Sequence, residues 1–182
     1  MKRLRLVAMS VAVAVLLIWG SPQSSIAQQP VQDHIKAVYE LTAESTNVPL
    51  LVPSAIPLNS PAAPTDYWAD SIAPKPDAYL ISFDRASDCT GVMECSFASV
   101  AGELAADSLY DYQQLLSERR NEEVVLEDGT RALFVPQRRP ELYTPASVYI
   151  LKGEYLYTFS IYMADKADVV AMANSATDAY DR

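Results

Sequence analysis

Three stretches of the chain alternate or cluster apolar residues in ways that predict β-strands. One follows Asp77 and a second runs from about Glu94 to Glu103. The longest, Glu154 to Met163, carries apolar side chains on both of its faces. Such a strand is either central and covered on both sides or part of a curved sheet with a concave pocket.

Two glycine-containing turns predict β-hairpins. Asp128-Gly129 separates residues 122–127 from residues 131–135, and Lys152-Gly153 separates residues 147–151 from residues 154–163. An Asp-Gly pair between β-rich runs favours a two-residue turn in which both positions have positive φ.

Helical spacing of apolar residues predicts three helices. The first covers Pro30 to Ser45, with Pro30 at the helix start, and an amphipathic one covers Asp107 to Arg120. The last covers Ala164 to Thr177 and begins at Ala164 or Asp165. Between the first two, residues 47–76 are rich in proline, which predicts extended chain.

These elements predict an α+β fold. We expect an antiparallel sheet of about five or six strands, with an N-terminal and a C-terminal helix packed on one face. The expected organisation along the chain is a signal peptide (1–27), an N-terminal helical segment (28–46), a Pro-rich extended segment (47–76), an antiparallel α+β core (77–177) and a frayed tail (178–182).

The first 27 positions have the layout of a secretory signal peptide. A basic start precedes the apolar run Leu6–Trp19, and Ser25-Ile26-Ala27 forms a small-x-small cleavage site. An uncleaved anchor is the alternative, but Leu6–Trp19 is shorter than the roughly 20 residues that span a bilayer. We therefore expect a periplasmic or secreted protein that meets the membrane only through this segment, before cleavage.

The charge of the mature chain excludes some partners. The whole chain has 23 acidic and 14 basic residues, and all charges of the signal segment are basic. A strongly acidic mature protein repels nucleic acid. One histidine, His34, and no Gly-rich phosphate loop argue against a His-based catalytic site and against nucleotide chemistry. The sequence therefore predicts no catalytic, cofactor-binding or metal-binding residue and no enzyme activity.

The two cysteines predict a structural disulfide. Cys89 and Cys95 enclose a short loop between the first two strands, and disulfides are expected in exported proteins. Redox catalysis would need a Cys-x-x-Cys pair, and a zinc site would need further ligands. The acidic residues Asp84, Asp88 and Glu94 around this loop suggest a calcium site or, more simply, a solvated acidic loop.

Aromatic residues in or near expected loops are the candidates for binding. They are Tyr67, Trp68, Tyr110, Tyr112 and Tyr143. Such side chains stack on sugars or fill a partner's pocket, although most tyrosines of a small β-rich domain simply pack.

Two arginine pairs also stand out in this acidic chain. Arg119-Arg120 and Arg138-Arg139 suit a carboxylate or phosphate ligand. Each pair stands beside glutamates, so local ion pairs are the simpler interpretation.

Several motifs have the order found in a known class of protein. The run Val48 to Pro57 has the form P-h-h-h-P-S-x-h-P, and a Tyr-rich strand, a Cys-containing loop, an Asp-Gly hairpin and a closing helix with Met172-Ala173-Asn174-Ser175 follow. This order resembles small exported α+β domains of unknown function, mostly known from cyanobacteria. The resemblance implies a fold but no activity and no functional residue. Leu58-Asn59 stands where many of those domains have a glycine.

The sequence as a whole favours a binding protein. We expect an exported, non-enzymatic binding or interaction domain of the cell envelope, whose partner is an unknown envelope protein or a hydrophobic small molecule. The alternative is a periplasmic carrier that holds a hydrophobic ligand in a curved-sheet pocket.

Overall fold

The computed structural model describes residues 28–30, 33–57, 64, 66–89, 95–138 and 144–178. The expected signal peptide lies outside these residues. The helices are α1 (Asp33–Ser45), α2 (Ala105–Ser117) and α3 (Lys166–Asn174). The strands of the main sheet are β4 (Trp68–Ser71), β5 (Ala78–Asp84), β6 (Ser96–Leu104), β7 (Glu122–Val125), β8 (Arg131–Val135), β9 (Ala146–Lys152) and β10 (Tyr155–Ile161).

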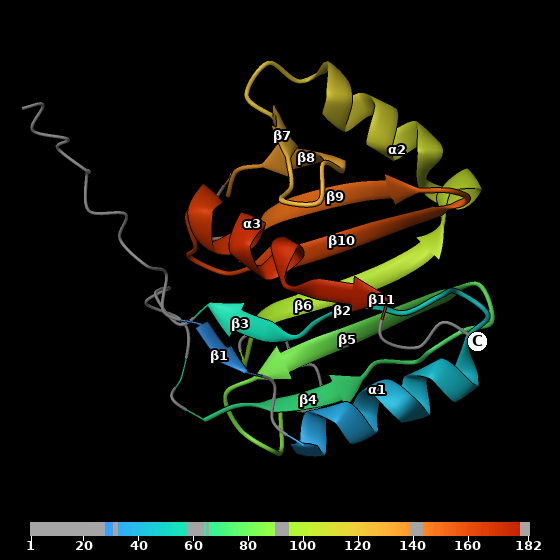
Figure 1. Ribbon diagram of the computed structural model, residues 1–182, viewed down its shortest axis with the longest axis vertical. Helices are drawn as coiled ribbons and strands as arrows, with labels where there is room; N and C mark the ends of the chain where they lie inside the picture. The colour runs from blue at the N-terminus through green and yellow to red at the C-terminus, as the bar shows by residue number, and fades with distance from the viewer. Residues whose placement is uncertain are drawn as a thin grey trace, which may run out of the picture.

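The main sheet is antiparallel and has seven strands in the order β4-β5-β6-β10-β9-β8-β7 (Figure 1). Two small sheets pair β1 (Gln28–Pro30) with β3 (Ala55–Pro57) and β2 (Leu51–Pro53) with β11 (Ala176–Asp178). The α+β class is confirmed, and the sheet is larger than the five or six strands expected.

The strand that the sequence did not indicate is β4. It lies in the Pro-rich segment 47–76 and pairs with β5 from Trp68↔Asp84 to Ser71↔Ile81. These four residues contain no proline, and an edge strand tolerates prolines beside it because only one of its sides needs hydrogen bonds.

Strand alternation gives the sheet two different faces. The core face carries the buried side chains of Tyr79, Ile81 and Phe83 from β5 and of Phe159 from β10. The outer face carries the residues between them; one row across five strands is Leu80, Ala101, Thr158, Tyr149 and Leu133. Strand β10 is central, as the apolar residues on both of its sides predicted.

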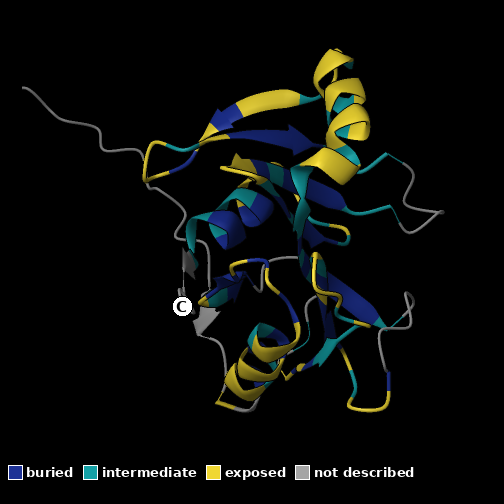
Figure 2. Ribbon diagram, turned by 90° about the vertical axis from the view of Figure 1, so that its right-hand side faces the viewer, coloured by how far each residue is buried: buried dark blue, intermediate teal, exposed yellow. Residues whose placement is uncertain are grey.

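The N-terminal helix α1 and the C-terminal helix α3 both contribute buried residues to the core, as expected, but α2 lies on the other side of the sheet (Figure 2). The C-terminal helix α3 buries Val169, Met172 and Ala173 against the core face. Helix α2 meets the outer face instead, where the ring centroids of Tyr112 and Tyr149 lie 6.4 Å apart, and none of its residues is buried. The core face is already covered by α3 and the small sheets, so the connection from β6 to β7 crosses the other side.

The two chain ends of the described region differ from expectation. Pro30 does not begin a helix: it ends β1, and α1 begins at Asp33. In the two-stranded sheet of β1 and β3 both strands are edge strands, and an edge strand tolerates a proline. At the other end, Asp178 belongs to β11, so the expected frayed tail does not begin there, and residues 179–182 lie outside the described residues.

Both predicted hairpins form, but the first turn has a different geometry, and the second lies one residue later than expected, at Gly153-Glu154, because Lys152 pairs with Tyr155 in the sheet. Gly129 has φ 86° and Gly153 has φ 62°, whereas Asp128 does not have positive φ. The N–H of Leu126 donates to the carbonyl of Thr130, and the N–H of Gly129 donates to the carbonyl of Leu126. This pattern is a three-residue loop that ends in a left-handed glycine.

Candidate functional site

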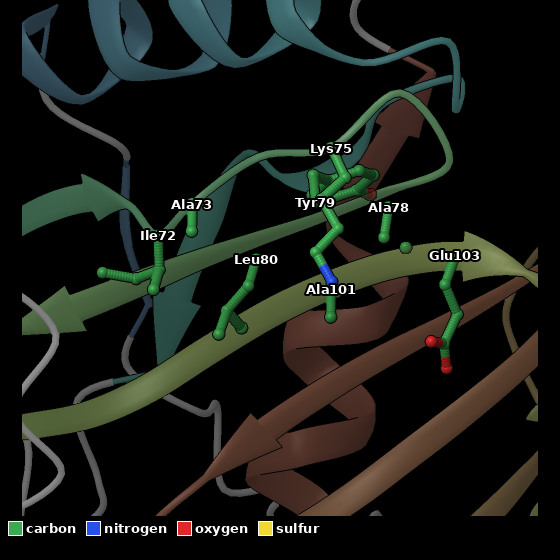
Figure 3. Close-up of a pocket in the computed structure, with 9 residues that line it drawn as sticks. Ile72, Ala73, Lys75, Ala78, Tyr79, Leu80, Ala101 and Glu103 are labelled. Carbon is green, nitrogen blue, oxygen red and sulfur yellow. The ribbon is translucent and has the colours of Figure 1, made fainter.

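A pocket of about 320 Å³ opens on the outer face of the sheet, above β5 and β6 (Figure 3). The loop after β4 forms its wall with Ile72, Ala73 and Lys75. The strands form its floor with Ala78, Leu80, Ala101 and Glu103, and Tyr79 and Gly102 complete the lining. A volume of this size is at the lower end of the range for small-molecule sites.

Small residues create the space above the floor. Ala78 and Ala101 present only methyl groups where larger side chains would fill the pocket. Leu80, which also lines the pocket, remains 38 % exposed. Apart from Glu103, the floor is therefore apolar and open to solvent, which is a favourable surface for an apolar group of modest size.

Tyr79 fixes the strand beneath the pocket. It lies opposite Gly102 on β6, and a Cβ atom at that glycine would stand 2.4 Å from the tyrosine Cε1 atom, so a glycine is needed there. The Tyr79 hydroxyl donates to the carbonyl of Leu51 and accepts from its N–H, both at 3.1 Å. Burial raises the pKa of Tyr79 well above its ordinary value. The phenol thus ties β5 to β2 and is not available to a ligand.

Hydrogen bonds hold the wall of the pocket in place. The N–H of Ile72 donates to the carbonyl of Leu80, and the N–H of Lys75 donates to the carbonyl of Ala78, both at 2.8 Å. The carbonyl of Pro76 accepts from the N–H of Asn47 at 2.8 Å. Prolines on both sides of Lys75 restrict the backbone further.

The wall also contains a strained residue. Ala73 has φ 41°, a left-handed conformation that residues with a Cβ atom rarely adopt. Strain of this kind persists only where the surrounding contacts impose it, and it is common at ligand sites.

Two opposite charges stand at the pocket. Lys75 is exposed, and among the described residues its ammonium forms no ion pair. In Figure 3 its side chain extends from the loop toward Ala101. Glu103 is half-buried and accepts a hydrogen bond from the Ser108 hydroxyl of α2 at 2.6 Å, which orients its carboxylate.

The aromatic residues suggested by the sequence do not form one site. Tyr67 is 1 % exposed, and its ring packs edge-on against Phe83 and Phe97, so no partner can reach its face. Burial raises the pKa of Tyr67 to about 12.

The other candidate aromatic residues are dispersed over two elements. Trp68 is 37 % exposed on β4, and Tyr110 is 72 % exposed on α2. Tyr112 is half-buried against Tyr149, and Tyr143 lies outside the described residues. None of the four that are described lines the pocket.

The arginine pairs engage a glutamate of their own chain. Glu118 accepts from Arg138 at 2.6 Å and from Arg120 at 3.2 Å. Desolvation opposes the effect, but these hydrogen bonds hold the pKa of Glu118 below its ordinary value. The local ion pairs account for two of the arginines, and Arg139 lies outside the described residues.

The disulfide is present. Cys89 and Cys95 are bonded, with their Cα atoms 5.6 Å apart. Beside them, buried Asp84 accepts hydrogen bonds from Ser96 at 2.6 Å and from Ser82 at 3.2 Å, so it belongs to a polar cluster within the sheet. In the part of the chain that is described, no three His, Cys, Asp or Glu residues are grouped as a metal site.

Comparisons with known proteins give no relative: no family model, no curated protein and no solved structure matches this chain. The pocket must therefore be interpreted from its own geometry.

Within the described ranges no helix has the length and apolar character needed to cross a bilayer. The disulfide is compatible with an oxidising, exported location.

Proposed function

We propose that this protein is an exported, non-enzymatic binding domain of the cell envelope, and that it holds a small envelope component in the outer-face pocket. The pocket carries this proposal. It combines an apolar floor, a wall held by backbone hydrogen bonds, and Lys75, whose ammonium forms no ion pair among the described residues. A pre-ordered site loses less entropy when a ligand binds.

The place of the expected cleavage site supports export. Strand β1 begins at Gln28, directly after the expected cleavage site Ser25-Ile26-Ala27. Removal of residues 1–27 would leave β1 and its pairing with β3 intact. The bond between Cys89 and Cys95 agrees with an oxidising compartment.

The pocket chemistry supports binding without catalysis. Its ionisable lining groups are Lys75, Glu103 and Tyr79, and the Tyr79 phenol is engaged by Leu51. Nucleophilic catalysis needs a nucleophile and a base within hydrogen-bond distance of each other. Ser108 and Glu103 lie within that distance, but Ser108 does not line the pocket, so we interpret this hydrogen bond as one that positions the carboxylate.

The carrier alternative has less support in the form first considered. A ligand enclosed between the sheet and α3 would have to displace Phe159, Val169 and Met172, all of which are fully buried in contact with the core. The described pocket opens on the opposite face, so a ligand there would remain partly exposed.

Native mass spectrometry of the protein exported to the periplasm tests the proposal. We expect a mass matching residues 28–182 with a small-molecule adduct. Ala101→Phe fills the floor of the pocket and should abolish the adduct, whereas Ala106→Phe, at an exposed position of α2, should retain it. An adduct that survives Ala101→Phe, or a bare chain in all three proteins, would contradict a binding role for this pocket.

A further inference from the structure

The two charges of the outer-face pocket do not neutralise each other, and this is the observation that defines its ligand. Lys75 and Glu103 both line the pocket, yet they form no ion pair. The Lys75 side chain extends toward Ala101 (Figure 3), which is two residues from Glu103 on the same face of β6.

From this arrangement we infer that the pocket binds a free α-amino acid with an aliphatic side chain. Its carboxylate would pair with Lys75 and its ammonium with Glu103. Because the two groups do not pair with each other, each can form a charge-assisted hydrogen bond of about 2.8 Å with one ligand that carries both charges. The inference rests on the proposed function, because it names the ligand of the same pocket.

The apolar floor provides for the side chain of such a ligand. Leu80, Ala101 and Ile72 offer aliphatic surface directly beside the two charges. Leu80 is exposed to 38 % without a ligand, and covering it would remove apolar surface from water.

The net charge of the protein favours a zwitterion over a simple anion. The chain carries a formal net charge of −9, and loss of its basic signal segment would make it more acidic. Such a protein repels anions at long range, whereas a neutral zwitterion is not repelled. A simple cation would be opposed locally by Lys75.

Isothermal titration calorimetry with three matched probes tests this inference. They are leucine, leucinamide, which lacks the carboxylate, and 4-methylpentanoate, which lacks the amine. We expect leucine to bind the exported, processed protein with a Kd of about 1 μM, which is tight enough for a bound ligand to survive purification and amounts to about −0.9 kcal/mol per non-hydrogen atom of leucine. Each truncated probe should bind about tenfold more weakly, since one charged contact is lost.

Two variants assign the contacts. Lys75→Met should weaken leucine and 4-methylpentanoate about tenfold but leave leucinamide unchanged, and Glu103→Gln should weaken leucine and leucinamide but not 4-methylpentanoate. Lys36→Met is the matched control, because Lys36 lies on α1 and pairs with Asp33. Circular dichroism checks that each variant is folded.

Equal affinity for the three probes, or no binding of leucine at about ten times the expected Kd, would overturn the amino-acid assignment. Leucine binding that is unaffected by both pocket variants would do the same. If the adduct seen by native mass spectrometry still depends on Ala101, the pocket remains a binding site for another ligand. If that adduct is absent too, the proposed function fails with the inference.

Discussion

At the scale of single residues, burial decides what each tyrosine can do. Tyr67 stands beside Trp68 in the sequence, but alternation along β4 sends Tyr67 into the core and leaves Trp68 partly exposed. The Tyr79 hydroxyl is likewise not available to a ligand in the pocket, because it donates to the carbonyl of Leu51 and accepts from the Leu51 N–H. An aromatic residue near a loop is therefore not by itself evidence of binding.

Buried tyrosines predict loss of stability at alkaline pH. Burial raises the pKa of Tyr67 to about 12, and an unfolded tyrosine titrates near 10. The folded pKa is the higher one, so this contribution to stability is fully present below about pH 10 and is lost as the pH rises through about 12. We expect cooperative unfolding in this window, followed by circular dichroism and tyrosinate absorbance.

Substitution assigns the effect to the buried ring. Tyr67→Phe removes an ionisable group. For a given free energy of unfolding at neutral pH, the variant should therefore have a higher midpoint pH of alkaline unfolding. Tyr110→Phe, at a position that is 72 % exposed, should leave the midpoint unchanged. Tyrosinate absorbance that develops fully while the protein stays folded would show that Tyr67 is accessible.

At the scale of elements, local sequence signals predicted the strands and hairpins better than they predicted the face of the sheet on which each helix packs. Gly129 and Gly153 mark turns because positive φ is easiest for glycine. The side on which α2 packs depends on which face α3 already covers, and periodicity along α2 carries no such information. Strand β4 was not predicted because four residues in a Pro-rich segment form a strand only when β5 is beside them.

Helix α3 should depend on its N-cap. The Asp165 carboxylate accepts a hydrogen bond from the N–H of Asp168 at 3.0 Å, as expected for the residue that begins this helix. Asp165→Ala should reduce the free energy of unfolding by about 1 kcal/mol, whereas Asp165→Asn retains a capping oxygen and should cost little. Urea denaturation measures both, and equal losses would show that the cap is not the cause.

At the scale of the whole molecule, the pocket is a product of strand register. Pro74, Lys75 and Pro76 adjoin one another in the sequence and could have indicated a rigid, charged loop. Glu103 and Ala101 come from a strand some 25 residues later, and only the pairing of Tyr79 with Gly102 brings them beneath that loop. Apolar alternation in the sequence indicates where the strands lie, but it does not indicate which residues of two strands are paired. Most of the sheet could therefore be predicted from the sequence, whereas the pocket could not.

The acidic net charge of the chain affects which ligands the outer-face pocket can bind. The chain has a formal net charge of −9, and Lys75 is the basic residue in the wall of its outer-face pocket. The surrounding acidity opposes simple anions and tolerates a ligand without net charge.

Amide-resolved NMR of the isotope-labelled, processed protein during titration with leucine tests whether the outer-face pocket binds an amino acid, because it shows where a ligand binds. Binding in this pocket predicts saturable shift changes concentrated in two segments, Ile72–Leu80 and Ala101–Glu103, which are distant in the sequence and both line the pocket. Changes centred instead on Tyr110 and the exposed side of α2, or a spectrum unaltered by the ligand, would contradict it.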